Sequence, residues 1–548
     1  MSILDRIRSN RPATGPTGVA VKVKAHNKPK LREKTQKRGI PRELMLGLAL
    51  ASAFYILGHY LVVAGVWPAH GTAIGAGGVL MRDAFAFIGW LLLLPVLRLL
   101  GYRGSWGIIV LPIMIFFLTR PSLFQLFTDP VYQARGGARQ EANALKAERS
   151  RLTTILRTYD EERQETVFEG EVPVLPDPID AIRELTEDER RSTTATLASA
   201  FSVVIAPLAL LFGFVVARRK GVLRWFRDHR IIPFGVVVGL FFVLTLFFVE
   251  LGRVGGTTPW ELFLPIFIGV FAAVLADDAY NLATPGAVVA PRRIALLMLY
   301  GALPLIPFLI IRELGLSVVL AGSLATMLLV ATRREWWAGL MIAIWIVLVA
   351  AAFNLDDRSQ TRLQLAINPY RDLSEMSTDE AQSWANRMHQ FKLFDANILA
   401  GGILGEGAGR GHPETAPNAA DDGYITTIAA HWGLAGTLSL VLLYSAFILQ
   451  MLSVAVQERS AFERSLATGL AMLLAIPFWM AALGGIRAVP LTGVATAFAA
   501  NGGAKLIASA LAVGIIAAIS HKRAESDRLE AAGEAMHAKP EEQGVRIR

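Results

Sequence analysis

Residues 231–249 read IIPFGVVVGLFFVLTLFFV, nineteen residues without one charged side chain. A run of about 20 apolar residues is long enough for a helix that crosses the hydrocarbon core of a bilayer. Comparable runs recur along the chain of 548 residues, of which 53% are hydrophobic and only 18% are charged. Soluble domains carry roughly 25% charged residues. The sequence therefore predicts an all-α polytopic membrane protein.

The same length criterion predicts about twelve spans and two long loops, 120–194 and 354–422. Cysteine is absent, which excludes disulfide bonds, thiolate catalysis and metal sites with cysteine ligands. The expected spans lie near residues 45–66, 84–100, 105–119, 195–217, 231–250, 259–276, 294–311, 313–331, 336–353, 424–453, 465–485 and 495–519.

The net charge of +9 is concentrated in residues 1–44, which hold twelve Lys or Arg and three acids. The remaining chain carries equal numbers of bases and acids, which argues against a nucleic-acid partner. Because Lys and Arg flank spans on the cytoplasmic side, we expect residues 1–44 to be a cytoplasmic tail before an uncleaved first span. An even number of spans returns the C-terminus to the cytoplasm, together with Arg333 and Arg334. Both long loops are acidic and then lie outside.

Two segments outside the spans have a pattern of their own. Residues 141–163 place Leu145, Leu152 and Ile155 on one helical stripe, which predicts an amphipathic helix. That helix either covers the membrane domain or docks another envelope protein. The tail 521–548 is polar and charge-balanced, and we expect it to be disordered.

The chemistry is expected at the end of the second long loop, where residues 401–436 read GGILGEGAGRGHPETAPNAADDGYITTIAAHWGLAG. Its glycines allow the backbone to bend closely around a ligand. Asp421 and Asp422 precede the next apolar run. Each is suited to two roles there: a helix N-cap or a general base at the membrane boundary.

This segment resembles the SEDS family, the FtsW, RodA and SpoVE polytopic proteins of cell division and elongation. GEGAG (405–409) leads to APNAADDGYITTIAAHWGLAG (416–436), in which Pro417 lies on the family proline and Asp422 on its essential aspartate. Asn418 and Ala420 replace the family's Glu and His, so the chain is a divergent member. Similar segments follow the family's order at TPWEL (258–262), RELGLSVVL (312–320), RLQLAINPYRD (362–372) and VPLTGVATAFAANGGAKLIA (489–508).

The resemblance implies a core of ten spans, related to GT-C enzymes, over residues 105–520. Residues 45–104 are then an added transmembrane hairpin, between the tail 1–44 and the C-terminal cytoplasmic tail 521–548. It also implies a location in the bacterial cytoplasmic membrane, with both termini in the cytoplasm.

The resemblance further implies an inverting glycosyltransferase that polymerises lipid II, a polyprenyl-pyrophosphate-linked donor, at the outer face of the membrane. The implied partners are a class B penicillin-binding protein and other proteins of division or elongation. No cofactor is certain, although a divalent cation (Mg or Mn) would suit the phosphates. The implied roles are Asp422 as general base, Arg362, Arg410, Arg487, Gly407, Gly409, Pro417, Asn501 and Lys505 in substrate binding, and Glu261 and Glu313 in coupling to a partner.

Three other functions remain open: a flippase for the lipid-linked precursor, a polymerase or ligase of another surface glycan, and a non-catalytic scaffold. A flippase is expected to carry several ionisable groups deep in its spans. Here those groups lie mostly at span ends and in outer loops, which favours the enzyme. The replaced family residues at Asn418 and Ala420 keep the scaffold open.

Overall fold

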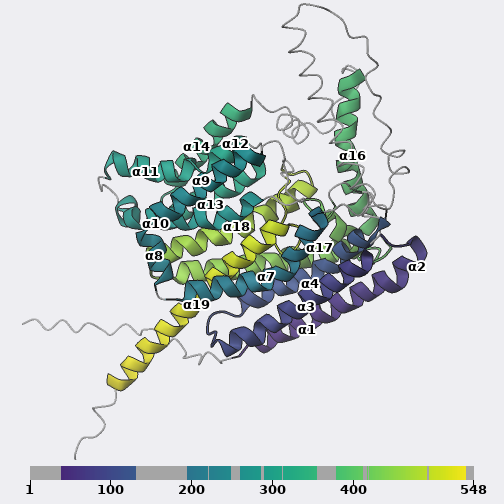
Figure 1. Ribbon diagram of the computed structural model, residues 1–548, viewed down its shortest axis with the longest axis horizontal. Coiled ribbons are helices and arrows are strands. Elements are labelled where there is room, and N and C mark those ends of the chain that lie inside the picture. The colour runs from purple at the N-terminus through teal and green to yellow at the C-terminus, as the bar shows by residue number, and fades with distance from the viewer. Residues whose placement is uncertain are drawn as a thin grey trace, which may run out of the picture. The chain divides into compact units, whose positions relative to one another are not determined.

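A computed structural model describes residues 39–73, 75–130, 194–219, 221–248, 259–284, 289–310, 313–353, 378–410, 416, 419–489 and 493–537. All regular structure in these ranges is helical (Figure 1). The helices are α1 (Arg42–Leu61), a π-helical turn (Val62–Val66), α2 (Trp67–His70), α3 (Ala76–Leu99), α4 (Gly107–Thr128), α7 (Thr194–Arg218), α8 (Val222–Asp228), α9 (Ile231–Phe248), a 3₁₀ helix (Pro259–Phe263), α10 (Leu264–Ala283), α11 (Pro291–Ala302), α12 (Leu305–Ile310), α13 (Leu314–Thr332), α14 (Glu335–Phe353), α16 (Thr378–Gly401), α17 (Tyr424–Gln457), α18 (Ala461–Gly485) and α19 (Gly503–His537).

The polytopic membrane fold is confirmed. In the described part of the chain, nine helices are long and apolar enough to cross a membrane. The pair α7 and α8, bent by 76°, would make a tenth. Shorter apolar helices lie at Ile231–Val243 and Glu335–Ala350, so each of the twelve expected spans coincides with an apolar helix.

Several expected ends of the spans are wrong. For α3 and α4 the reason is that a charged residue was taken as the end of the helix. Helix α4 continues past Arg120 to Thr128, and α3 begins at Ala76 rather than after Asp83. The last span begins at Gly503, since residues 493–502 form a non-helical loop with Phe498 at φ 63°. Part of the second long loop is α16, and the predicted helix at 141–163 lies outside the described residues.

The C-terminal segment is also more ordered than expected, because α19 continues as a helix to His537. Its sequence is rich in Ala, Glu, Arg and Leu, which are good helix formers. Two ion pairs join it to the start of α18. Arg459 donates to Glu530 at 2.7 Å, and Lys522 donates to Glu463 at 3.4 Å.

Helices α7 and α19 lie side by side, and glycines set how closely they approach. A Cβ on Gly514 would overlap the Leu210 carbonyl oxygen of α7, and a Cβ on Gly213 would crowd the Leu511 carbonyl of α19. Small residues at such contacts let helix backbones come close in a membrane, where packing rather than hydrophobic burial drives association.

A buried ionic cluster joins α1 and α3 to α4. Asp83 of α3 is fully buried, and Arg120 of α4 donates to both of its carboxylate oxygens at 2.9 and 2.8 Å. Arg82 donates a third bond at 2.8 Å, and the His59 ring of α1 lies 3.3 Å from the same carboxylate. Tyr55 donates to the Asp83 main-chain carbonyl at 2.8 Å. His59 of α1 is therefore hydrogen-bonded to the neighbouring helix α3.

Replacing the shared carboxylate tests this cluster. Asp83→Asn leaves two buried guanidinium groups without their counter-charge, which costs about 3–5 kcal/mol in comparable buried pairs. We expect a clear drop in the thermal unfolding midpoint of the purified protein in detergent. Arg98→Gln is the control, because Arg98 is an exposed residue of the same helix and such changes usually stay within about 0.5 kcal/mol. Equal midpoints for both variants would refute a structural role for the cluster.

Candidate active site

The candidate site is built around an interruption of helix α17. At Gly433 the backbone adopts φ 62° and ψ −165°, which is not helical. Backbone groups on either side of the break lose their helical partners, and inside a membrane they need others. The glycine-rich loop that follows α16 supplies them. Glu406 N–H donates to Ala430 O at 3.0 Å, Gly407 N–H to His431 O at 2.9 Å, Leu434 N–H to Gly402 O at 2.9 Å and Ala435 N–H to Ile403 O at 3.0 Å.

This backbone pairing requires glycine at three positions. A Cβ on Gly401 would overlap the Ala429 carbonyl oxygen, and one on Gly405 would overlap the His431 carbonyl. A Cβ on Gly433 would overlap Gly405 N and Ile403 O. The sequence suggested that these glycines bend around a ligand, whereas Gly401 and Gly405 bend around α17.

Gly407 and Gly409 have φ values of 91° and 88°, which glycine adopts most readily. The Gly407 N–H is used in the bond to His431, and the Gly409 N–H donates to Gln125 Oε1 of α4 at 2.7 Å. A Cβ on Gly409 would also overlap Val66. Both N–H groups therefore bind the protein itself, and they fix the loop against α17 and α4.

Asp422 lies in a tight turn, residues 419–423, immediately before α17, and is 6% exposed. The N-cap residue of α17 is Gly423, so neither Asp421 nor Asp422 is the N-cap residue of this helix. Thr427 Oγ1 donates to the Ala419 carbonyl at 2.8 Å, which holds the turn to the first turns of the helix. Asp422 is thus a buried carboxylate in a braced turn.

A second loop, residues 493–502, contacts the Asp422 turn. The Asn501 N–H donates to the Ala420 carbonyl at 2.8 Å. Lys505, in the first turn of α19, is 1% exposed, and its ammonium group forms no hydrogen bond within the part of the chain that the structure describes. Glu261 of the 3₁₀ helix is 5% exposed and acts electrostatically on Lys505. The structure therefore brings Glu261, which the resemblance assigned to coupling, close to Lys505, which it assigned to substrate binding.

The arginines expected to bind the substrate lie in different environments. Arg487 has φ 61° and forms an ion pair with Asp395 of α16 at 2.9 Å. It follows Gly485, whose position packs against Ile425 near the Asp422 turn. Arg410 is exposed at the end of the glycine-rich loop. Arg362 and Pro417 lie outside the described residues.

Glu313 is the N-cap residue of α13 and is partly exposed, so it lies at a helix end as expected. Its main-chain carbonyl accepts a hydrogen bond from the Ser317 N–H at 3.3 Å. No group of three or more His, Asp or Glu side chains in the described ranges is arranged to hold a metal ion. The divalent cation therefore stays a prediction, and no chemical step is assigned to it.

His431 lies inside α17 and is fully buried. Its neighbour Trp432 donates from Nε1 to Ser122 Oγ of α4 at 3.0 Å. The family's His position is also apolar here. Ala420 packs in a buried cluster with Ala416, Ala419, Leu123, Leu126 and Phe394.

The sequence model of the FtsW/RodA/SpoVE family, whose members are described as cell cycle proteins, matches residues 249–525, half of the chain. The chain belongs to this family. It is 30% identical over 210 residues to the peptidoglycan glycosyltransferase RodA of Mycobacterium tuberculosis, which is 38% of this chain and 42% of that protein. The probable peptidoglycan glycosyltransferase FtsW of Geobacter metallireducens is 29% identical over 213 residues, 38% of this chain and 53% of that protein. The chain thus spans about half the length, or less, of these curated relatives.

Solved structures of two polytopic proteins also align with this member of the family. A chain described under "Structural coordination of polymerization and crosslinking by a peptidoglycan synthase complex" is 20% identical, with a TM-score of 0.38, and 59% of this chain covers 97% of it. The rod-shape-determining protein RodA of Thermus thermophilus is 17% identical, with a TM-score of 0.32, and 60% of this chain covers 95% of it. Family membership and the apolar helices identify a multi-pass bacterial membrane protein.

Gly405→Ala tests the pairing between the glycine-rich loop and α17. The new methyl group overlaps the His431 carbonyl and must adopt φ 82°, so we expect a loss of at least about 2 kcal/mol of stability. If the loop detaches, trypsin should also cleave faster after the exposed Arg410. Gly239→Ala in α9 is the control, since its Cβ meets open space and alanine is the better helix former. Unchanged stability and cleavage in Gly405→Ala would contradict the pairing.

Proposed function

We propose that the protein is a peptidoglycan glycosyltransferase that polymerises lipid II at the outer face of the bacterial cytoplasmic membrane. Membership of the FtsW/RodA/SpoVE family and the names of its relatives support this activity. The observation that carries the proposal is the position of Asp422, a 6% exposed carboxylate in a turn braced by α17 and by the 493–502 loop.

In the proposed reaction, the 4-hydroxyl of an acceptor sugar attacks the anomeric carbon of the lipid-linked donor and inverts its configuration. The bond from that carbon to the lipid pyrophosphate breaks, and the pyrophosphate leaves with the bonding electrons. A sugar hydroxyl is a weak nucleophile, so the reaction needs at least one general base, a positioned carboxylate that accepts the hydroxyl proton. Asp422 has this role. Its carboxylate is largely shielded from water, and its turn is fixed before substrate arrives.

The leaving pyrophosphate requires cationic groups around it. We assign this role to Arg410, which is exposed at the end of the glycine-rich loop, and to Lys505, whose ammonium is buried close to Asn501 in sequence and space. Arg362 and Pro417 are proposed to complete the substrate site. Arg487 contributes positive charge after its ion pair with Asp395 opens, whereas Gly407 and Gly409 act by shaping the loop that presents Arg410.

The neighbouring Glu261 and Lys505 suggest how a partner would be coupled to the site. Glu261 lies in the 3₁₀ helix before α10, and α19 packs on that helix. A class B penicillin-binding protein, or another protein of division or elongation, that displaces the 3₁₀ helix would change the electrostatic environment of Lys505. Glu313 is proposed to contribute to the same coupling.

A non-catalytic scaffold is the second candidate, because Ala420 fills the family's His position with an apolar side chain in an apolar cluster. Under that function the membrane fold and partner binding persist without glycan synthesis. A polymerase of another glycan would instead retain the need for Asp422.

Glycan synthesis by the purified full-length protein tests these functions. It would be incubated with lipid II, with and without a candidate class B transpeptidase, and the product length measured on gels. We expect polymer from wild type and a loss of about 100-fold or more in rate with Asp422→Asn, since general base catalysis contributes 10²–10⁴-fold. Asp421→Asn is the matched control and should retain the rate within a few-fold.

Two results would contradict the proposal. No polymer from wild type with any partner would favour the scaffold or another glycan. Polymer from Asp422→Asn at the wild-type rate would remove Asp422 as the base.

A further inference from the structure

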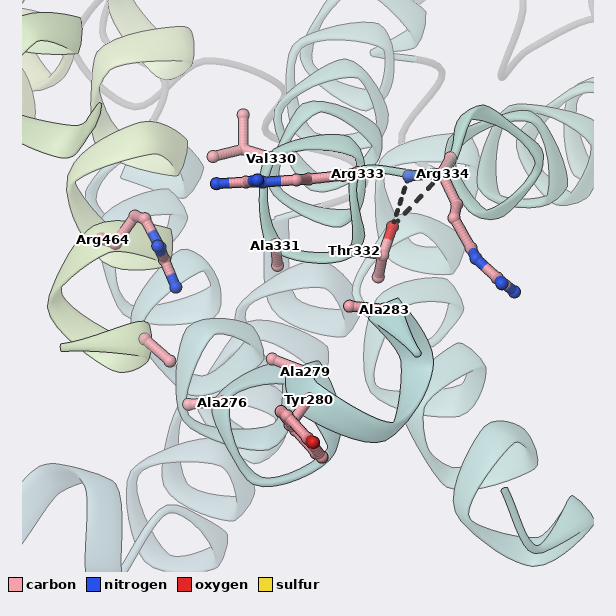
Figure 2. A pocket seen from close by; sticks show the side chains of 11 residues that line it. Ala276, Ala279, Tyr280, Ala283, Val330, Ala331, Thr332, Arg333, Arg334 and Arg464 are labelled. Atoms are coloured by element: carbon pink, nitrogen blue, oxygen red, sulfur yellow. Dashed lines mark hydrogen bonds between the residues drawn. The ribbon is translucent and has the colours of Figure 1, made fainter. Parts of the chain in front are cut away.

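A cavity of about 690 Å³ opens between α10, α13 and α18 (Figure 2). It lies far from the candidate active site. Ala461 at the start of α18 lines it, whereas Gly485 at the end of the same helix packs near the Asp422 turn. The 25 residues of α18 separate the two places by roughly 36 Å. The volume lies within the range of about 300–1,000 Å³ that small-molecule sites occupy.

The wall of the cavity is apolar and made of small side chains, which leave the space open. Tyr280 lies at one side of it in Figure 2. The apolar lining residues come from all three helices: Ala276, Ala279 and Ala283 from α10, Val330 and Ala331 from α13, and Ala461 from α18.

Three arginines, Arg333, Arg334 and Arg464, also line the cavity. Figure 2 shows the Arg333 side chain extending from the end of α13 toward the α18 side, where Arg464 lies, while Arg334 extends the other way. The Arg464 Nε is buried, and no described residue accepts a hydrogen bond from it. Among the residues that the structure describes, no carboxylate forms an ion pair with these three arginines. Other arginines at this end do find one, since Arg227 and Arg230 pair with Asp277 and Arg293 pairs with Asp278.

Arg333 is held in an unfavourable backbone conformation. It is the C-cap residue of α13 with φ 55° and ψ 27°, in the left-handed region where glycine is usual at a helix end. For other residues such a conformation costs on the order of 1 kcal/mol or more. The buried Thr332 fixes the turn, since its hydroxyl donates to Leu328 O at 2.7 Å and accepts from Arg334 N–H at 3.2 Å. The turn therefore directs an arginine over the cavity where glycine would be easier.

We infer that this cavity binds an anionic phospholipid, with its phosphate between Arg333 and Arg464 and its acyl chain against the alanine wall. A guanidinium group can donate two parallel hydrogen bonds to the oxygens of one phosphate. The apolar wall next to the two arginines suits the acyl chain of a lipid better than a free ion. The positive-inside rule places this end of the helices in the cytoplasm, where the leaflet is rich in anionic lipid. The C-terminal ends of α10 and α13 lie here and carry partial negative charge, which disfavours a phosphate. Binding therefore depends on the positive charge of both Arg333 and Arg464. The inference is independent of the glycosyltransferase activity.

The test measures lipid retained by the full-length protein in native mass spectrometry, after purification in detergent with equal amounts of phosphatidylglycerol and phosphatidylcholine. Wild type should retain phosphatidylglycerol preferentially, and Arg333→Gly and Arg464→Gln should each reduce that retention about tenfold. Arg334→Gln removes the same charge from a side chain that points away, and should match wild type. Inorganic phosphate at millimolar concentration should compete poorly.

Arg333→Gly also separates binding from a structural role, since it removes the side chain and relieves the strained turn. Its lipid-free thermal midpoint should equal or exceed that of wild type, although its lipid retention falls. A lowered lipid-free midpoint would make Arg333 a structural cap and overturn the inference. Wild-type retention in both Arg333→Gly and Arg464→Gln would also overturn it, and full competition by inorganic phosphate would replace the lipid by a free anion.

Discussion

The interruption of α17 at Gly433 is the constraint on which the rest of the candidate site depends. A helix that breaks within a membrane domain leaves amide and carbonyl groups that lipid cannot satisfy. The glycine-rich loop after α16 pairs with them on both sides of the break, which is possible only because Gly401, Gly405 and Gly433 lack a Cβ. The same loop is bound to α4 through Gly409 and Gln125. The position of the chain before and after the Asp422 turn is thereby fixed.

The second organising feature is the pairing of charges inside the apolar helices. Asp83 and Arg120 are 37 residues apart in sequence and join α3 to α4. Apolar run length predicted the helices because it is a local property of the sequence. It misplaced the start of α3 and the end of α4, because an apolar run was taken to exclude charged residues. The expected spans therefore began after Asp83 and ended before Arg120. A charge in such a run signals a partner elsewhere, but the partner's identity depends on tertiary packing, which the sequence does not display.

For the candidate site, too, the sequence identified the segments involved but not the contacts between them. The sequence identified the glycine-rich loop, Asp422 and the 489–508 segment as parts of the site. The structure brings the last two together, since the Asn501 N–H donates a hydrogen bond to the Ala420 carbonyl beside Asp422. It did not indicate that the glycines serve α17, because their partners are backbone atoms about 25 to 30 residues further along the chain. It also assigned Lys505 and Glu261 to separate roles, although the structure brings α19 and the 3₁₀ helix that carry them together. These relations depend on packing between helices distant in sequence.

Hydrogen exchange of the backbone amides of Glu406, Gly407, Leu434 and Ala435 tests the central claim most directly. If the glycine-rich loop pairs with α17 across its break, these amides exchange as slowly as those within the helices of the membrane core, and Gly405→Ala makes them exchange quickly while lipid II polymerisation falls. Fast exchange of the same amides in the wild-type protein would contradict the account.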